Sequence, residues 1–275
     1  MTYCVAMRLQ AGLVFLSDSR TNAGMDQIST FRKMTVYEKE GDRVLVMLSA
    51  GNLAITQAVK QLVGNETIEG SDGESCTIWT AKCLFDVARI VGSCVRKVHA
   101  RDAAALKQHG IDFNCSLIIG GQIGNETMRL FNVYAAGNFV EAGIDGVCYF
   151  QIGESKYGKP VIDRVITPQT PLEEAAKCAL ISMDSTLKSN LSVGLPLDML
   201  VYEAGALKVD KLIHIDESNP YFRMIRSTWG QRLRQVFDSI PEPSWNADQA
   251  DLHLPSTATQ AQAMNPLSKI SAPNG

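Results

Sequence analysis

Apolar and polar positions along the first fifty residues fall into four short blocks. Residues 3–9 and 13–17 form the first pair of blocks, joined by a turn that ends in Gly12. Residues 33–38 and 43–50 form the second pair, and the later block of this pair is almost entirely apolar. The pattern predicts two β-hairpins, and it indicates that the last strand is covered on both faces.

Helical spacing of apolar residues follows in three places. It runs from Ile55 to Val63, from Leu84 to Val98, and onward from Pro171, a favourable first helical position. Further strands are predicted at residues 115–121, 129–135, 147–152, 197–203 and 208–215, and a final helix at 221–240. Because strands and helices do not alternate, we expect an α+β fold with two mostly antiparallel sheets stacked face to face and helices outside both.

The composition changes after residue 240. Residues 241–275 contain five prolines, many Ser, Thr, Asn and Gln residues, and few large apolar ones. Such a segment does not bury enough apolar surface to fold by itself. We therefore predict one domain over residues 2–240, followed by a tail over 241–275 that is disordered or held only by its neighbours.

Composition and charge narrow the range of functions. The chain has 275 residues, a formal net charge of -3 and no basic run, so nucleic acid is not an expected partner. No stretch approaches the roughly 18 apolar residues of a membrane span, and the amino terminus does not resemble a signal peptide, so we expect a cytoplasmic protein that is not bound to a membrane. The seven cysteines include no Cys-x-x-Cys pair and the four histidines are dispersed. We therefore expect reduced core cysteines and no metal or other cofactor.

The start of the chain carries the first candidate for chemistry. Removal of Met1 would expose Thr2, and an amino-terminal threonine places a hydroxyl beside its own α-amine. The amine, with an ordinary pKa of about 7.7–8.0, can act as general base for that hydroxyl at neutral pH. A Met-Thr start is nevertheless common, so the neighbouring residues decide its meaning.

Three further positions belong to the same candidate site. Asp18 ends the second strand of the first hairpin, which brings it near the start of the first strand, and Lys33 begins the third strand beside an apolar run. A buried lysine paired with this aspartate would lower the pKa of a nearby hydroxyl. Gly51, between an apolar strand and a helix, could direct its backbone N–H toward an oxyanion. Each residue alone also has a structural interpretation: Asp18 as a turn residue at the end of a strand, Lys33 as a charge on an edge strand, and Gly51 as a strand-to-helix turn.

Taken together, these residues resemble the proteasome β-subunit pattern of amino-terminal nucleophile (Ntn) hydrolases. In detail the chain is similar to the bacterial Anbu family, the ancestral β-subunits or proteasome-type proteases, over roughly residues 2–240. The segments that carry this resemblance are residues 15–24 (FLSDSRTNAG), 31–34 (FRKM), 48–53 (LSAGNL), 117–121 (LIIGG) and 152–160 (IGESKYGKP).

The resemblance implies a four-layer αββα sandwich and a site in which Thr2 is nucleophile and base. Asp18 and Lys33 would tune its hydroxyl, and the Gly51 N–H would hold the oxyanion. Members of the family assemble into many-subunit rings or open spirals. Their genes often neighbour ATP-grasp genes, so an ATP-dependent or ATP-grasp-type partner is a further expectation.

Two features depart from the β-subunit pattern. Glu154 stands where β-subunits carry a serine, and Ser155 comes one place later. The supporting Asp-x-x-Ser group matches Asp184 by position, but either Ser185 or Ser192 could be its serine. Asp184 is therefore carried over as a catalytic residue, and the roles of Glu154 and these serines stay open.

The main hypothesis is a self-assembling threonine-type peptidase that cleaves peptide or protein substrates through an acyl-enzyme ester. Two alternatives remain: a ring or spiral scaffold with an idle site, and an amidohydrolase for a non-protein amide. Retention of Thr2, Asp18 and Lys33 together argues against the idle scaffold. From the sequence, Lys33→Ala is expected to remove hydrolysis while leaving assembly and melting near wild type.

Overall fold

The computed structural model describes residues 1–22, 28–143 and 146–243. The chain divides into two compact units, residues 1–232 and 233–275. Helix α5 (Pro220–Ser239) begins in the first unit and ends in the second. The predicted tail lies outside the described residues from residue 244 onward, so its expected disorder stays a prediction.

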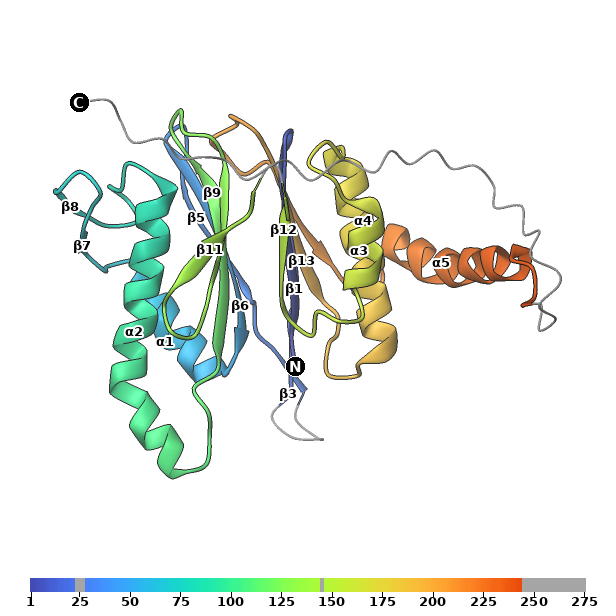
Figure 1. Cartoon of the computed structure of the whole chain (residues 1–275), viewed down its shortest axis with the longest axis horizontal. Helices are drawn as coiled ribbons and strands as arrows, with labels where there is room; N and C mark the ends of the chain where they lie inside the picture. The colour runs from blue at the N-terminus through green and yellow to red at the C-terminus, as the bar shows by residue number, and fades with distance from the viewer. Residues whose placement is uncertain (23–27, 144–145, 244–275) are drawn as a thin grey trace. The chain divides into compact units, whose positions relative to one another are not determined.

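Two five-stranded antiparallel sheets form the framework of the first unit (Figure 1). The first has the order β12-β1-β2-β13-β14, with bounds β1 Tyr3–Leu9, β2 Gly12–Asp18, β12 Tyr149–Gly153, β13 Leu197–Glu203 and β14 Lys211–Ile215. The second has the order β11-β10-β9-β6-β5, with bounds β5 Met34–Lys39, β6 Arg43–Gly51, β9 Cys115–Ile123, β10 Arg129–Val133 and β11 Phe139–Glu141. Two short ladders pair β3 (Arg20–Asn22) with β4 (Ile28–Thr30) and β7 (Ile68–Glu69) with β8 (Ser75–Cys76).

Each sheet sends its side chains into two different apolar clusters, because successive residues of a strand point to opposite faces. One cluster combines residues of both sheets, among them Ala6 and Phe15 of the first and Val46 of the second, so it lies between them. The alternate residues Val5 and Met7 belong to another cluster, with residues of the helices beside the first sheet. This two-sided burial is the reason that these strands are apolar at nearly every position.

Helices supply the outer partners of the sheets. The residues of α1 (Leu53–Val63) and α2 (Leu84–Gln108) pack against β6 and β9 in one cluster. The residues of α3 (Lys159–Val165), α4 (Leu172–Ser189) and the first turns of α5 pack against β1, β2 and β13 in another. Figure 1 shows α1 and α2 beside the second sheet, and α3 and α4 beside the first. Each fully buried aliphatic side chain in these clusters contributes roughly 1.5–3 kcal/mol to folding.

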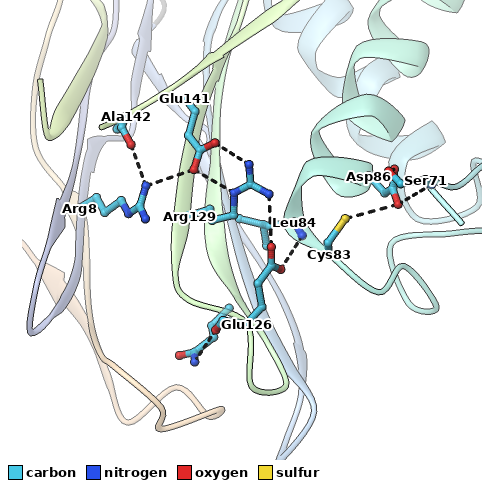
Figure 2. A network of polar contacts seen from close by, with 10 residues as sticks. Arg8, Ser71, Cys83, Leu84, Asp86, Glu126, Arg129, Glu141 and Ala142 are labelled. Carbon is cyan, nitrogen blue, oxygen red and sulfur yellow. Dashed lines mark hydrogen bonds and ion pairs between the residues drawn. The ribbon is translucent and has the colours of Figure 1, made fainter. Parts of the chain in front are cut away.

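A polar network connects the two sheets (Figure 2). Arg8 of β1 donates to Glu141 of β11 at 3.1 Å, and Arg129 of β10 contacts the same carboxylate at 2.5 Å. Arg129 also contacts Glu126, whose second oxygen accepts from the backbone N–H of Leu84 at 2.8 Å. Glu126 thereby caps the amino-terminal end of α2, which has no side-chain cap of its own.

The predicted α+β class is confirmed by the antiparallel sheets and the helices that pack beside them. Both amino-terminal hairpins are confirmed by the register of β1 with β2 and of β5 with β6. The short elements α3, β3, β4, β7, β8 and β11 were not expected from the sequence. Their lengths of two to seven residues are too short for a periodic apolar pattern. All seven cysteines are free, and six of them are buried. No helix among the described residues is long and apolar enough to cross a membrane.

Candidate active site

A cavity of about 560 Å³ opens where the start of β1 meets the ends of β6 and β12 and one face of α1. Three of the residues predicted for catalysis line it together: Thr2, Lys33 and Gly51. The remaining lining residues are Met1, Arg20, Phe31, Arg32, Ser49, Ala50, Leu53, Thr56, Gln57, Lys60, Asn114, Gly153 and Glu154.

Thr2 is fixed in this cavity through its backbone. It precedes β1, and its carbonyl oxygen accepts a hydrogen bond of 2.7 Å from the N–H of Glu154. Gly153, which pairs with Tyr3 across β1 and β12, has φ +81°, and a Cβ atom there would lie 1.9 Å from the Thr2 oxygen. A glycine at the end of β12 therefore permits the close approach that holds the Thr2 backbone.

Asp18 and Lys33 form an ion pair beneath Thr2. The Lys33 ammonium donates to both carboxylate oxygens of Asp18, at 2.7 and 2.8 Å, and to the carbonyl oxygen of Arg20 at 2.7 Å. Asp18 also accepts from the backbone N–H of Tyr3 at 3.0 Å, so it touches the residue that follows Thr2. The side chain of Asp18 is fully buried and that of Lys33 is 8% exposed. The hairpin register explains this meeting, since Cys4 pairs with Ser17 and Asp18 comes one residue later.

Burial shifts the titration of the groups around this pair. It raises the pKa of Asp18, while the Lys33 ammonium and the backbone N–H of Tyr3 act in the opposite direction. The free amine of Met1 has a pKa below its ordinary value of 8.0, first because of burial and second because of the positive charge of Lys33. The Met1 amine is therefore neutral over more of the physiological range than an exposed amine.

The hydrogen-bond ladder of β6 determines the direction of the Gly51 N–H. Asn52 donates its backbone N–H to Asn114, next to β9, whereas Ser49 donates to Lys33, next to β5. Donors alternate between the two edges of an antiparallel strand, so the N–H of Gly51 lies on the same edge as that of Ser49. Since β5 begins only at residue 34, this N–H lies beyond the end of the ladder, at the cavity.

Asp184 lies elsewhere. It belongs to α4, is not among the residues that line the cavity, and its carboxylate is 3.5 Å from the Nε atom of Arg226 on α5. Burial raises the pKa of Asp184. The hydroxyl of Ser185 donates back to the carbonyl of Ile181 within α4 at 3.0 Å, so Ser185 is also turned to its own helix.

The structure brings in residues that the sequence did not suggest. Asn190, at the end of α4, donates to the carboxylate of Glu154 at 2.9 Å, and its oxygen accepts from the N–H of Ser192. Glu154 also pairs with Lys156 at 3.3 Å. An asparagine after a helix is typical of a cap, and nothing local in the sequence connects it with a glutamate 36 residues earlier.

The cavity carries three groups used in acyl transfer: the Thr2 hydroxyl, the buried Lys33 ammonium and the Gly51 backbone N–H. Loss of Met1 would add the Thr2 amine as a fourth. No group of three or more potential metal ligands occurs within residues 1–22, 28–143 and 146–243.

Comparison with known proteins finds matches among solved structures. No family model and no curated protein sequence matches the chain. Among solved structures, Anbu (ancestral beta-subunit) from Yersinia bercovieri is 50% identical, with a TM-score of 0.79, over 88% of this chain and 100% of that one. An Anbu (Gly-1) mutant from Hyphomicrobium sp. strain MC1 is 45% identical, with a TM-score of 0.80, over 89% and 100%. The Anbu complex from Pseudomonas aeruginosa, solved as a helical assembly, is 44% identical, with a TM-score of 0.79, over 89% and 99%.

Proposed function

The chain belongs to the Anbu family of ancestral proteasome β-subunits, and from this premise we propose that it is a threonine-type amidohydrolase that cleaves peptide bonds. The observation that carries the proposal is the buried Asp18–Lys33 pair on the cavity that Thr2 and Gly51 share. A buried ion pair is costly to desolvate, so its position at a cavity wall favours a role in chemistry.

In the proposed reaction, Thr2 is the first residue after loss of Met1. Its α-amine takes the hydroxyl proton while the hydroxyl oxygen forms a bond to the substrate carbonyl carbon. The N–H of Gly51 donates to the oxyanion, and the Lys33 ammonium, held by Asp18, stabilises negative charge that develops on the hydroxyl oxygen. The C–N bond then breaks, and the leaving amine receives the proton from the Thr2 ammonium. Water then attacks the ester carbonyl and gives a proton to the same amine. The ester C–O bond breaks, the amine passes its proton to the departing Thr2 oxygen, and the acid product leaves with the Thr2 hydroxyl restored.

We infer the same family architecture for the whole domain, a four-layer αββα sandwich over residues 2–240. Its support is the separation of three apolar clusters, one containing side chains of both sheets and two containing helix residues against one sheet each. We also propose that the chain assembles with copies of itself into a ring or spiral. The helical assembly described for the Pseudomonas aeruginosa relative supports this.

The test of the function is the intact mass of the purified protein before and after reaction with a peptide epoxyketone. This electrophile forms a ring with both the hydroxyl and the amine of an amino-terminal threonine, so it reports both groups together. We expect a chain that lacks Met1 and gains one adduct, located on Thr2 by peptide mapping. Thr2→Ala should gain none and should hydrolyse no peptide, whereas Thr67→Ala, an exposed threonine outside the cavity, should behave as wild type. Full activity with Met1 retained would refute the amino-terminal mechanism.

A further inference from the structure

One face of α1 forms a wall of the cavity. Leu53, Thr56, Gln57 and Lys60 all line it, and their spacing of three, one and three residues places them on a single side of the helix. The wall begins two residues after Gly51, the proposed oxyanion donor. Lys60 stands seven residues along the helix from Leu53, a rise of about 10 Å. The far end of this wall is therefore a lysine.

The Lys60 ammonium is half-buried and has few polar partners. Its one hydrogen bond among the described residues is donated to the backbone carbonyl of Arg32, at 3.1 Å. No carboxylate lies within ion-pair distance of it in the part of the chain that the structure describes. Burial lowers the pKa of Lys60, which reflects the same missing counter-charge. Lys33 on the same cavity differs, because its charge is matched by Asp18.

Two further positive charges lie on the cavity. Arg20 and Arg32 also line it, and neither forms an ion pair with a described carboxylate. The Nε atom of Arg20 is buried without a hydrogen-bond partner among the described residues. The one acidic lining residue, Glu154, already contacts Lys156 and Asn190 beside Thr2. Among the described residues, the α1 side of the cavity thus carries positive charge that no carboxylate balances.

We propose that this side of the cavity binds a carboxylate of the substrate, and that the enzyme prefers glutamate as the residue whose carbonyl is attacked. The proposal rests on the proposed function, because the attack of Thr2 and the Gly51 N–H fix the position of the scissile carbonyl. The side chain next to that carbonyl extends along the α1 wall, past Leu53 and Thr56, toward Lys60. Glutamate reaches further along this wall than aspartate, so aspartate is the second choice. The half-buried Lys60 ammonium has no carboxylate partner among the described residues, so a substrate carboxylate would supply its counter-ion, which makes the interaction selective for charge.

The first test compares peptides that differ only in the residue before the cleaved bond: Glu, Gln, Leu or Lys. We expect kcat/KM for the Glu peptide to exceed that for the Gln peptide by about 10- to 100-fold, the range of one charge-assisted hydrogen bond. Lys60→Met should lose the preference for Glu over Gln, and Lys60→Arg should retain it. Lys82→Met, which removes an exposed lysine away from the cavity, is the matched control and should keep it as well. Equal cleavage of Glu and Gln peptides by the wild type would overturn the proposal.

A second test separates this proposal from the proposed function. Thr2→Ala lacks the nucleophile, so binding of the same peptides as carboxyl-terminal amides can be measured by fluorescence anisotropy without turnover. Tighter binding of the Glu peptide, lost when Lys60→Met is added, supports the anion site even if the wild type hydrolyses nothing. Equal binding of Glu and Gln peptides to Thr2→Ala would overturn the anion site, whatever the outcome of the epoxyketone experiment.

Discussion

Replacement of Lys33 by methionine is expected to affect both folding and catalysis. The sequence suggested that a functional lysine contributes little to stability, but the structure changes that expectation. Asp18 is fully buried and Lys33 is its ion-pair partner, with two contacts of 2.7 and 2.8 Å. Lys33→Met leaves the carboxylate buried without a counter-charge. Removing one partner of a buried pair costs about 3–5 kcal/mol, so we expect a loss of this size in the free energy of unfolding at neutral pH.

The pH dependence of this loss follows from the titration of Asp18. Burial already raises its pKa above the ordinary 3.8, and Lys33 opposes the rise. Without Lys33 the folded-state pKa is higher still, so between 3.8 and that raised value the folded variant binds more protons than the unfolded chain. Stability of the variant therefore falls as pH rises through this window, by about 1.4 kcal/mol per pH unit. The variant should be closest to wild type in acid and furthest from it above the raised pKa.

The assay is urea unfolding of both proteins at one protein concentration, over a series of pH values. Asp18→Asn combined with Lys33→Met removes both charges, so it should recover most of the lost stability but none of the hydrolysis. Lys82→Met removes an exposed pair with Asp72 and should leave stability unchanged. Wild-type stability of Lys33→Met at neutral pH, with no slope against pH, would refute the reasoning. In that case the ion pair would be of no consequence for folding.

Four further outcomes are expected. Burial and Lys33 lower the pKa of the Met1 amine, and we expect the same surroundings to act on the Thr2 amine once Met1 is lost. Only the neutral amine is a base, so kcat/KM should rise with pH through an inflection below 8.0, and an inflection above 8.0 would contradict this. Gly153→Ala should abolish hydrolysis and lower Tm, because the added Cβ would lie 1.9 Å from the Thr2 oxygen. Gly41→Ala is the control: Gly41 has a similar φ of +76° but open space around it, so this variant should lower Tm only slightly and keep activity. Asp184→Asn should leave kcat/KM near wild type, because Asp184 contacts Arg226 and not the cavity; a large loss would restore it to the site. Sedimentation should give a mass several-fold above 30.0 kDa, and a clean monomer would exclude the proposed assembly.

Much of the framework could be predicted because it depends on local patterns. The apolar blocks around the turn at Gly12 determine the first hairpin, and the hairpin register alone brings Asp18 to the backbone of Tyr3. Thr2, Lys33 and Gly51 line one cavity because each lies at the end of a strand or next to it, and these strand ends lie close together. The missed elements are a helix of seven residues and strands of two or three residues, which are too short to establish a period.

Contacts between distant segments could not be predicted in this way. Asn190 and Glu154 meet because the end of α4 packs beside the end of β12, and neither residue carries a local signal of that meeting. The position of Asp184 beside Arg226 likewise depends on the packing of α5 against α4. Matching by position in the chain selected Asp184, but it did not show that α4 places this side chain beside Arg226.

The two lysines of the cavity show why charge balance matters more than residue type. In the sequence, Lys33 and Lys60 are both lysines near apolar segments, and only the first attracts attention. In the structure Lys33 has a buried carboxylate at 2.7 Å, so its charge is already satisfied and it can hold a fixed geometry for a nucleophile. Lys60 has a carbonyl at 3.1 Å and no described carboxylate, so its charge is available to a ligand. A paired cation stabilises and positions groups of the protein itself, whereas an unpaired one at a cavity wall favours an anion from outside.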